Sequence, residues 1–168
     1  MANLEIERKF LINGFPELKP TRCAETEQGY LCHEPVVRIR RSSSGGVDKY
    51  KLCFKGKGTL VRTEMEMDLT AEQYAQLYDL LPEATVKKEF RTYALDNGLV
   101  LECSHVDPGE ETSFFYAEVE FPSEEAAQNF VPPDFLGRDV TEDPSFTMSH
   151  YAKVKREKGH WPWASKNK

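Results

Sequence analysis

The chain has 168 residues, of which 39% are hydrophobic and 30% charged, and its net charge is −6. These totals are typical of one soluble globular domain, and the negative charge disfavours nucleic acid and anionic membranes as partners. No apolar run approaches the ~18 residues of a membrane span, and the N-terminus lacks the apolar core of a secretory signal, so we expect a cytoplasmic protein. The four cysteines show no Cys-x-x-Cys spacing and are expected to be reduced thiols.

Eight segments are predicted to be β-strands, most of them separated by turn-rich sequences. They cover about 3–11, 28–32, 35–42, 47–55, 60–69, 85–94, 98–106 and 113–121. Their close succession leaves no room for the long crossovers that parallel strands need, so antiparallel hairpins are favoured. Asn97-Gly98 is a strong hairpin signal between two of them.

Three helices are predicted. Residues 70–73, Thr-Ala-Glu-Gln, form a capping box that begins a helix ended by Pro82. Ser123 caps a second helix that runs to about residue 130. A third runs from about Ser145 to Glu157, and its apolar stripe is expected to pack against the wall of the sheet.

Charged residues repeat with a period of two along the predicted strands. Because successive side chains of a strand point to opposite faces, Glu5, Glu7 and Lys9 share one face. The same alternation gives further one-sided charges at Arg38, Arg40, Lys51, Lys55, Arg62, Glu64, Glu66, Glu102, Glu118 and Glu120. A solvated face mixes neutral polar residues and opposite charges, whereas these are short runs of one sign. If the sheet closes into a barrel, they line a charged lumen.

The acidic and basic groups suggest phosphoryl transfer. Glutamates from the two ends of the chain converge only if the first and last strands are neighbours, and carboxylates then suit Mg²⁺ or Mn²⁺. The basic group would bind phosphate oxygens: Lys9, Arg38, Arg40, Lys55, Arg62 and Lys88. A metal-assisted water would be the nucleophile. The sequence shows no P-loop, no dinucleotide fingerprint and no Ser-His-Asp set.

The order of these motifs resembles the CYTH superfamily, also called triphosphate tunnel metalloenzymes. The N-terminal Glu-x-Glu-x-Lys signature of that family matches residues 5–9, and the similarity extends over about residues 3–155, with matching motifs at 28–31, 38–40, 54–56, 62–66, 117–121 and 139–143. The chain is most similar to the short bacterial branch, whose members are mostly inorganic triphosphatases. The resemblance implies an α+β, mainly β fold: an eight-stranded antiparallel closed β-barrel tunnel with a charged lumen and helices packed outside. We expect a single domain of this kind over residues 1–158, and the last residues, 159–168, are predicted to be a loose tail.

The resemblance also implies the roles of individual residues. The residues expected to bind the metal, Mg²⁺ or Mn²⁺, are Glu5, Glu7, Glu120 and Glu118. The residues expected to bind the substrate are Lys9, Arg38, Arg40, Lys55, Arg62, Lys88 and Arg91. The candidate catalytic residues are Lys9, Arg62, Lys88 and Tyr30, although Tyr30 equally fits an aromatic packing role. Supporting lumen acids are Glu64, Glu66 and Glu102.

Two positions depart from the family pattern. Aligned from the Asn97-Gly98 turn, Lys88 takes the place of a family lysine, but Phe90 takes the place of an arginine. Arg91 then faces outward unless a bulge shifts the register of its strand. Ser104 stands where the family usually has a second acid, so the lumen has lost one group of each sign.

The predicted function is metal-dependent hydrolysis of inorganic triphosphate, or of another compact triphosphate, at the terminal phosphate. A class IV adenylate cyclase is disfavoured because its His-Phe-x₄-Phe stretch is missing, and a thiamine triphosphatase-like activity stays open. Two further hypotheses are a non-catalytic polyphosphate- or nucleotide-binding module and a barrel whose charges only pair with one another. The expected partner is a small-molecule triphosphate, without nucleic acid or membrane, and the protein is expected to be a monomer or homodimer.

Overall fold

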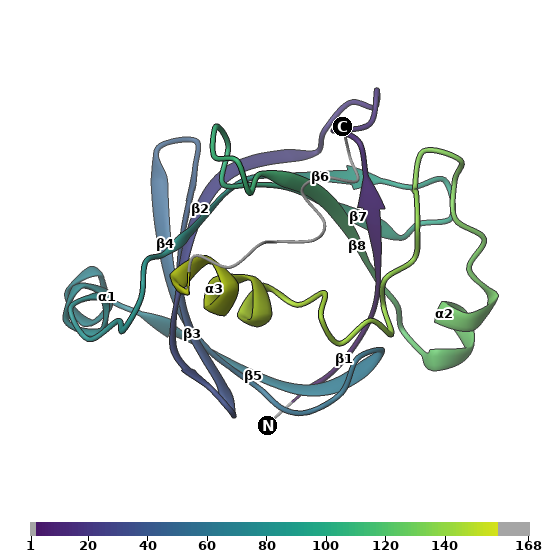
Figure 1. The fold of residues 1–168 in the computed structure, drawn as a ribbon. Helices are drawn as coiled ribbons and strands as arrows, with labels where there is room; N and C mark the ends of the chain where they lie inside the picture. Colours follow the sequence, from purple (N-terminus) through teal and green to yellow (C-terminus); the bar gives the residue numbers. More distant parts are fainter. Residues whose placement is uncertain (1–2, 158–168) are drawn as a thin grey trace.

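The computed structural model describes residues 3–157, so the predicted tail over 159–168 lies outside the described part. Eight antiparallel strands close into a barrel in the order β1-β5-β4-β3-β2-β6-β7-β8, and they form a ring in Figure 1. Their bounds are Asn3–Ile12 (β1), Arg22–His33 (β2), Val36–Ser44 (β3), Val47–Lys55 (β4), Val61–Leu69 (β5), Val86–Ala94 (β6), Val100–Val106 (β7) and Phe114–Glu120 (β8). The predicted closed eight-stranded barrel is confirmed.

β1 closes the barrel because it pairs with β5 on one side and with the last strand, β8, on the other. Glu5 lies opposite Arg62 in β5, and Glu7 lies opposite Glu120 in β8. Side chains that share a face along β1 therefore meet acidic and basic partners from distant parts of the chain. This closure brings the two acidic motifs to neighbouring strands.

β2 is much longer than the predicted segment 28–32. Its first half, from Arg22 to Glu27, pairs with β6, and from Glu25 onward β2 also pairs with β3. This half contains glutamates, a threonine and an arginine, most of which have little β-propensity of their own. Pairing with neighbouring strands supplies the backbone hydrogen bonds that local propensity did not predict.

Two of the helices lie outside the ring of strands, as expected (Figure 1). α1 (Ala71–Tyr78) begins at the predicted capping box, in which the Thr70 and Gln73 side chains each accept a backbone N–H of the other residue. α2 (Glu124–Asn129) is capped by Ser123, as predicted. Beside α2, an apolar cluster that includes Phe10, Phe121 and Phe130 covers the outer face of β1.

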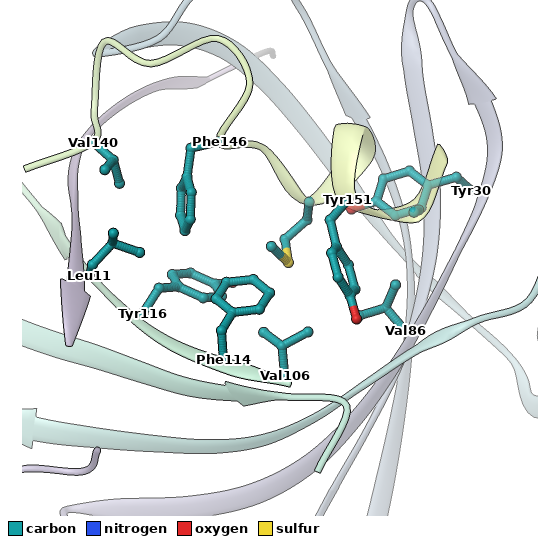
Figure 2. Close-up of a cluster of buried hydrophobic side chains, with 11 residues drawn as sticks. Leu11, Tyr30, Val86, Val106, Phe114, Tyr116, Val140, Phe146 and Tyr151 are labelled. Atoms are coloured by element: carbon teal, nitrogen blue, oxygen red, sulfur yellow. The ribbon is translucent and has the colours of Figure 1, made fainter. Parts of the chain in front are cut away.

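α3 (Met148–Arg156) does not pack outside the barrel, and in this respect the prediction was wrong. The helix begins after Thr147, its N-cap, and lies across one end of the ring in Figure 1. Its buried residue Tyr151 packs among side chains that point toward one another from β7 and β8 and from the loop before α3, including Val106, Phe114 and Phe146 (Figure 2). The inward-facing positions of these strands change from charged to apolar at this end, so the apolar face of α3 finds its partners inside the rim.

A chain of hydrogen bonds ties α3 to the barrel. The Ser149 hydroxyl lies 2.6 Å from His33 Nδ1, and His33 Nε2 lies 2.8 Å from a Glu83 carboxylate oxygen. The Glu83 side chain is fully buried. A second tie joins Asp107 to the Tyr151 hydroxyl at 2.6 Å and to Lys155 Nζ at 2.8 Å. Within residues 3–157, no helix has the length and apolar character needed to cross a membrane.

Replacing His33 with alanine is expected to loosen α3 because it removes both hydrogen bonds and leaves the buried Glu83 carboxylate without its imidazole partner. We expect a cost of about 1–3 kcal/mol in the free energy of unfolding, with faster hydrogen exchange concentrated in α3. His105→Ala is the control, since His105 also lies near a glutamate and a serine, 3.4 Å from Glu89 and 2.9 Å from Ser113, but on the outer surface. Unchanged exchange in α3 would contradict this anchoring role.

Candidate functional site

The barrel encloses a cavity of about 1,220 Å³. It is lined by alternate residues of the strands, as the period of two in the sequence requires. All the predicted site residues except Arg91 line it: Glu5, Glu7, Lys9, Tyr30, Arg38, Arg40, Lys55, Arg62, Glu64, Glu66, Lys88, Glu102, Glu118 and Glu120.

The prediction of Arg91 as a substrate-binding residue was wrong. β6 pairs with β2 and β7 in continuous register, with Phe90 opposite Ala24 and Ser104, so no bulge turns Arg91 inward. The Arg91 guanidinium instead lies 4.0 Å from the centre of the Phe15 ring. Phe90 and Ser104 line the cavity, as the ungapped alignment predicted.

Arg62 bridges the two acidic residues that begin β1. Its Nε donates to Glu5 at 2.8 Å, and its Nη2 donates to Glu7. Lys55 Nζ also donates to Glu5, at 2.9 Å. Burial opposes ionisation of Glu5, but a hydrogen bond with Glu64 and the charges of Lys55 and Arg62 hold its pKa well below the usual value. The planar, forked guanidinium suits this double contact, which a lysine could not reproduce.

A second acidic pair lies where β1 meets β8. Lys9 Nζ lies 3.0 Å from a Glu118 carboxylate oxygen and 3.8 Å from Glu7. Burial opposes ionisation of Glu118, but the nearby Lys9 and Lys88 lower its pKa to about 2. Burial and the negative charge of Glu118 raise the pKa of Glu7. No hydrogen bond or ion pair to the Glu120 side chain is found among the described residues.

Glu102 on β7 adds a further carboxylate to this wall. Burial and the neighbouring charge of Glu118 raise its pKa to about 7. The acidic wall is defined as Glu5, Glu7, Glu102, Glu118 and Glu120. Burial contributes most to the raised pKa values of Glu7 and Glu102, and repulsion from the neighbouring carboxylates adds to it. A divalent cation would relieve this repulsion, and carboxylate oxygens are the donors that Mg²⁺ and Mn²⁺ prefer, so the residues fit such an ion.

Replacing Glu102 with glutamine is expected to stabilise the metal-free protein at pH 8 but not at pH 5. The folded-state pKa of about 7 lies above the usual glutamate value of 4.5, so the wild type loses stability as pH rises through this range. At about 1.4 kcal/mol per pKa unit, the variant gains up to about 3 kcal/mol at pH 8. Urea unfolding in EDTA at both pH values measures the difference, and equal effects at the two pH values would contradict the assignment.

Cations from β3 and β4 line the lumen across from β7 and β8, and one of them, Lys55, reaches Glu5 on β1. The basic wall is defined as Arg38, Arg40, Lys51 and Lys55. Arg40 and Lys51 both pair with Glu66, at 3.1 and 2.8 Å. The buried Nε of Arg38 has no hydrogen-bond partner in the described structure. An unpaired buried donor is costly, and an anion in the lumen would satisfy it.

Lys88 and Tyr116 meet beside the end closed by α3. Lys88 Nζ lies 2.5 Å from the Tyr116 hydroxyl, and burial lowers the pKa of this lysine to about 7. Its ammonium can therefore exchange a proton near neutral pH. Tyr30 accepts a hydrogen bond from the Gln28 amide at 2.8 Å, and burial raises its pKa to about 12. Tyr30 also packs in the cluster of Figure 2, so it combines a lumen position with a packing role.

Sequence reasoning left several lumen residues out of the candidate site, among them Lys51 and Tyr116. Lys51 shares the face of Lys55 along β4, and Tyr116 shares the face of Glu118 along β8, so the alternation itself could have identified both. Cys53, Glu64 and Glu66 each offer a ligand atom within 4.8 Å of the others. However, Cys53 donates to Glu64 at 2.9 Å, and Glu66 is already paired with cations. The acidic wall is therefore the more suitable metal site.

Comparisons with known proteins agree with this geometry. No model of a known protein family matches the chain. An inorganic triphosphatase of Nitrosomonas europaea is 34% identical over 84% of this chain and 92% of that protein. An inorganic triphosphatase of Acetivibrio thermocellus is 30% identical over 89% of this chain and 93% of its own length.

Among solved structures, the crystal structure of an inorganic triphosphatase aligns with a TM-score of 0.64 and 30% identity. The alignment covers 90% of this chain and 95% of that protein. The similarity therefore spans the whole barrel and is not confined to one motif. The chain belongs to the inorganic triphosphatase branch of the CYTH, or triphosphate tunnel, family.

Proposed function

We propose that this protein hydrolyses inorganic triphosphate at its terminal phosphate, with Mg²⁺ or Mn²⁺ as cofactor, inside the barrel. The observation that carries the proposal is the opposition of the acidic wall on β1, β7 and β8 to the basic wall on β3 and β4 across one cavity. An anion that brings its own divalent cation complements both walls at once. The names of the two relatives support inorganic triphosphate as the substrate.

In this proposal the metal ion is held by Glu5, Glu7, Glu118 and Glu120. When bound, it neutralises phosphate charge and lowers the pKa of a water molecule. Arg38, Arg40 and Lys55 bind the phosphate chain, and the guanidinium forks favour two oxygens of one phosphate.

Four residues have positions suited to the reaction itself. Lys9 and Arg62 already contact the acidic wall, so they lie between the metal carboxylates and the phosphates and neutralise the charge that develops during cleavage. Lys88 holds or releases a proton at Nζ near neutral pH, next to the Tyr116 hydroxyl. Tyr30 stays protonated and presents a hydroxyl at the edge of the lumen.

Phosphate release measured with malachite green tests this function. The substrates are inorganic triphosphate, pyrophosphate, ATP and thiamine triphosphate, each with Mg²⁺, with Mn²⁺ and with EDTA. Phosphate release from triphosphate that requires metal is the expected result. No phosphate release from any of the four substrates, or equal rates of release with metal and with EDTA, would contradict the proposal. Cyclic AMP formation from ATP would indicate a cyclase, and calorimetric binding without release would indicate a binding module.

We also propose the cytoplasm as the place of action. All four cysteines are free thiols, and Cys53 and Cys103 are buried. Free thiols are usual in a reducing compartment. Export of the mature protein to an oxidising compartment in its native cell would contradict this location.

A further inference from the structure

We propose that Phe90 forms a stacking platform for the aromatic base of a nucleoside triphosphate whose phosphates lie on the basic wall. This inference rests on the proposed function and deepens it, because it assigns the same site a second substrate class. It concerns the part of the lumen around Phe90 on β6.

Phe90 is an apolar side chain in a lumen that otherwise holds mainly charged and polar groups. It lines the cavity and is half-buried. It belongs to neither of the two hydrophobic clusters, one at the end closed by α3 and one on the outer wall of the barrel. Among the described residues it makes no aromatic contact, unlike Phe15 or Phe114. Its ring face is therefore available to a ligand.

The two residues paired with Phe90 are small and neutral: Ala24 on β2 and Ser104 on β7. Charged residues that also line the cavity lie two positions along the three strands, at Arg22, Lys88 and Glu102. An uncharged planar base can stack on the Phe90 ring among these residues, whereas a bare phosphate gains nothing from the ring.

The position of Phe90 along β6 suits the nucleoside of a nucleoside triphosphate whose phosphates lie deeper in the lumen. Inward-facing residues follow in the order Val86, Lys88, Phe90 and Thr92. Val86 packs in the cluster beneath α3, so Phe90 lies on the side of Lys88 that faces away from the closed end. A triphosphate whose terminal phosphate lies near Lys88 would direct its ester group past Phe90.

The size of the lumen is consistent with a ligand larger than three phosphates. The cavity of about 1,220 Å³ exceeds the ~300–1,000 Å³ of common small-molecule sites. Stacking on an aromatic ring accepts every base, because each base has a π-face. The platform therefore predicts nucleoside triphosphate binding with little preference among bases.

The test is calorimetry, in Mg²⁺, with two analogues that resist hydrolysis. One is β,γ-imido ATP, and the other is diimidotriphosphate, which has the phosphate chain but no nucleoside. Phe90→Ala is expected to weaken binding of the nucleotide by about 5- to 150-fold, with binding of diimidotriphosphate changed less than about 2-fold. Phe90→Tyr is expected to restore nucleotide affinity. Phe54→Ala, the same change on the outer face of β4, is expected to alter neither affinity.

The outcomes separate this inference from the proposed function. Equal weakening of both analogues by Phe90→Ala, no weakening of either, or failure of the wild type to bind the nucleotide would overturn the platform. Phosphate release from inorganic triphosphate is measured on the same proteins. Release combined with an unaffected nucleotide affinity rejects the platform alone, whereas selective loss of nucleotide affinity without any release supports the platform and rejects the hydrolase.

Discussion

Replacing Glu7 with glutamine is expected to lower metal-dependent triphosphate hydrolysis by about 10²–10³-fold without destabilising the metal-free protein. Glu7 is buried, and burial together with the charge of Glu118 raises its pKa. Ionised Glu7 therefore destabilises the folded protein, and the free energy of unfolding falls as pH rises through the folded-state pKa of Glu7. A neutral glutamine removes this cost together with a metal-binding charge. Phosphate release with Mn²⁺ and urea unfolding in EDTA at pH 8 measure the two effects.

The matched control is Glu89→Gln, which makes the same change on the outer face of β6, where Glu89 lies 3.4 Å from His105. It should leave hydrolysis unchanged. A Glu7→Gln protein that is clearly less stable, yet keeps its metal affinity and activity, would indicate that the lumen charges only pair with one another. That outcome would remove the basis of the proposed metal site.

Replacing Arg62 with methionine is expected to cost about 3–5 kcal/mol of stability at pH 8 and to abolish measurable hydrolysis. The guanidinium bridges Glu5 and Glu7, so its removal leaves two carboxylates in the interior without their shared partner. Mn²⁺ should restore more stability to this variant than to the wild type, because the ion supplies the missing positive charge. Urea unfolding with and without Mn²⁺ measures this recovery.

Two further variants sharpen this prediction. Arg91→Met removes an outward-facing arginine that stacks on Phe15, and it should cost no more than about 1 kcal/mol. The double variant Glu7→Gln/Arg62→Met should be more stable than the sum of the single effects predicts, because the two groups interact. Additive effects and no selective recovery with Mn²⁺ would contradict the bridging role of Arg62.

The barrel was predictable from sequence because its signals are local. Period-two alternation and short turn-rich connections indicate antiparallel strands, and the family resemblance supplied the closure that pairs β1 with β8. The extent of β2 was not predictable, since residues 22–27 gain their strand conformation from β3 and β6. The place of α3 depends on where the lumen changes from charged to apolar, at Leu11, Val86 and Val106. Strand alternation alone does not locate that boundary.

The part of the candidate site that was predictable from sequence is the part set by strand register, namely which side chains face the lumen. Register alone decided that Phe90, and not Arg91, faces the lumen, and this choice needed the observed continuous pairing of β6. The hydrogen bonds from Ser149 through His33 to Glu83 could not be predicted from the sequence, because they form only when three distant segments fold together. Perturbed pKa values such as those of Lys88 and Glu102 depend on burial, which sequence does not provide.

The most direct measurement is anomalous diffraction from crystals grown with Mn²⁺ and diimidotriphosphate. We expect a manganese peak inside the barrel at the carboxylates of β1 and β8, with phosphate density between it and the cations of β3 and β4. Manganese bound at Cys53, Glu64 and Glu66, or on the outer surface with no phosphate in the lumen, would contradict the proposed opposition of the two walls.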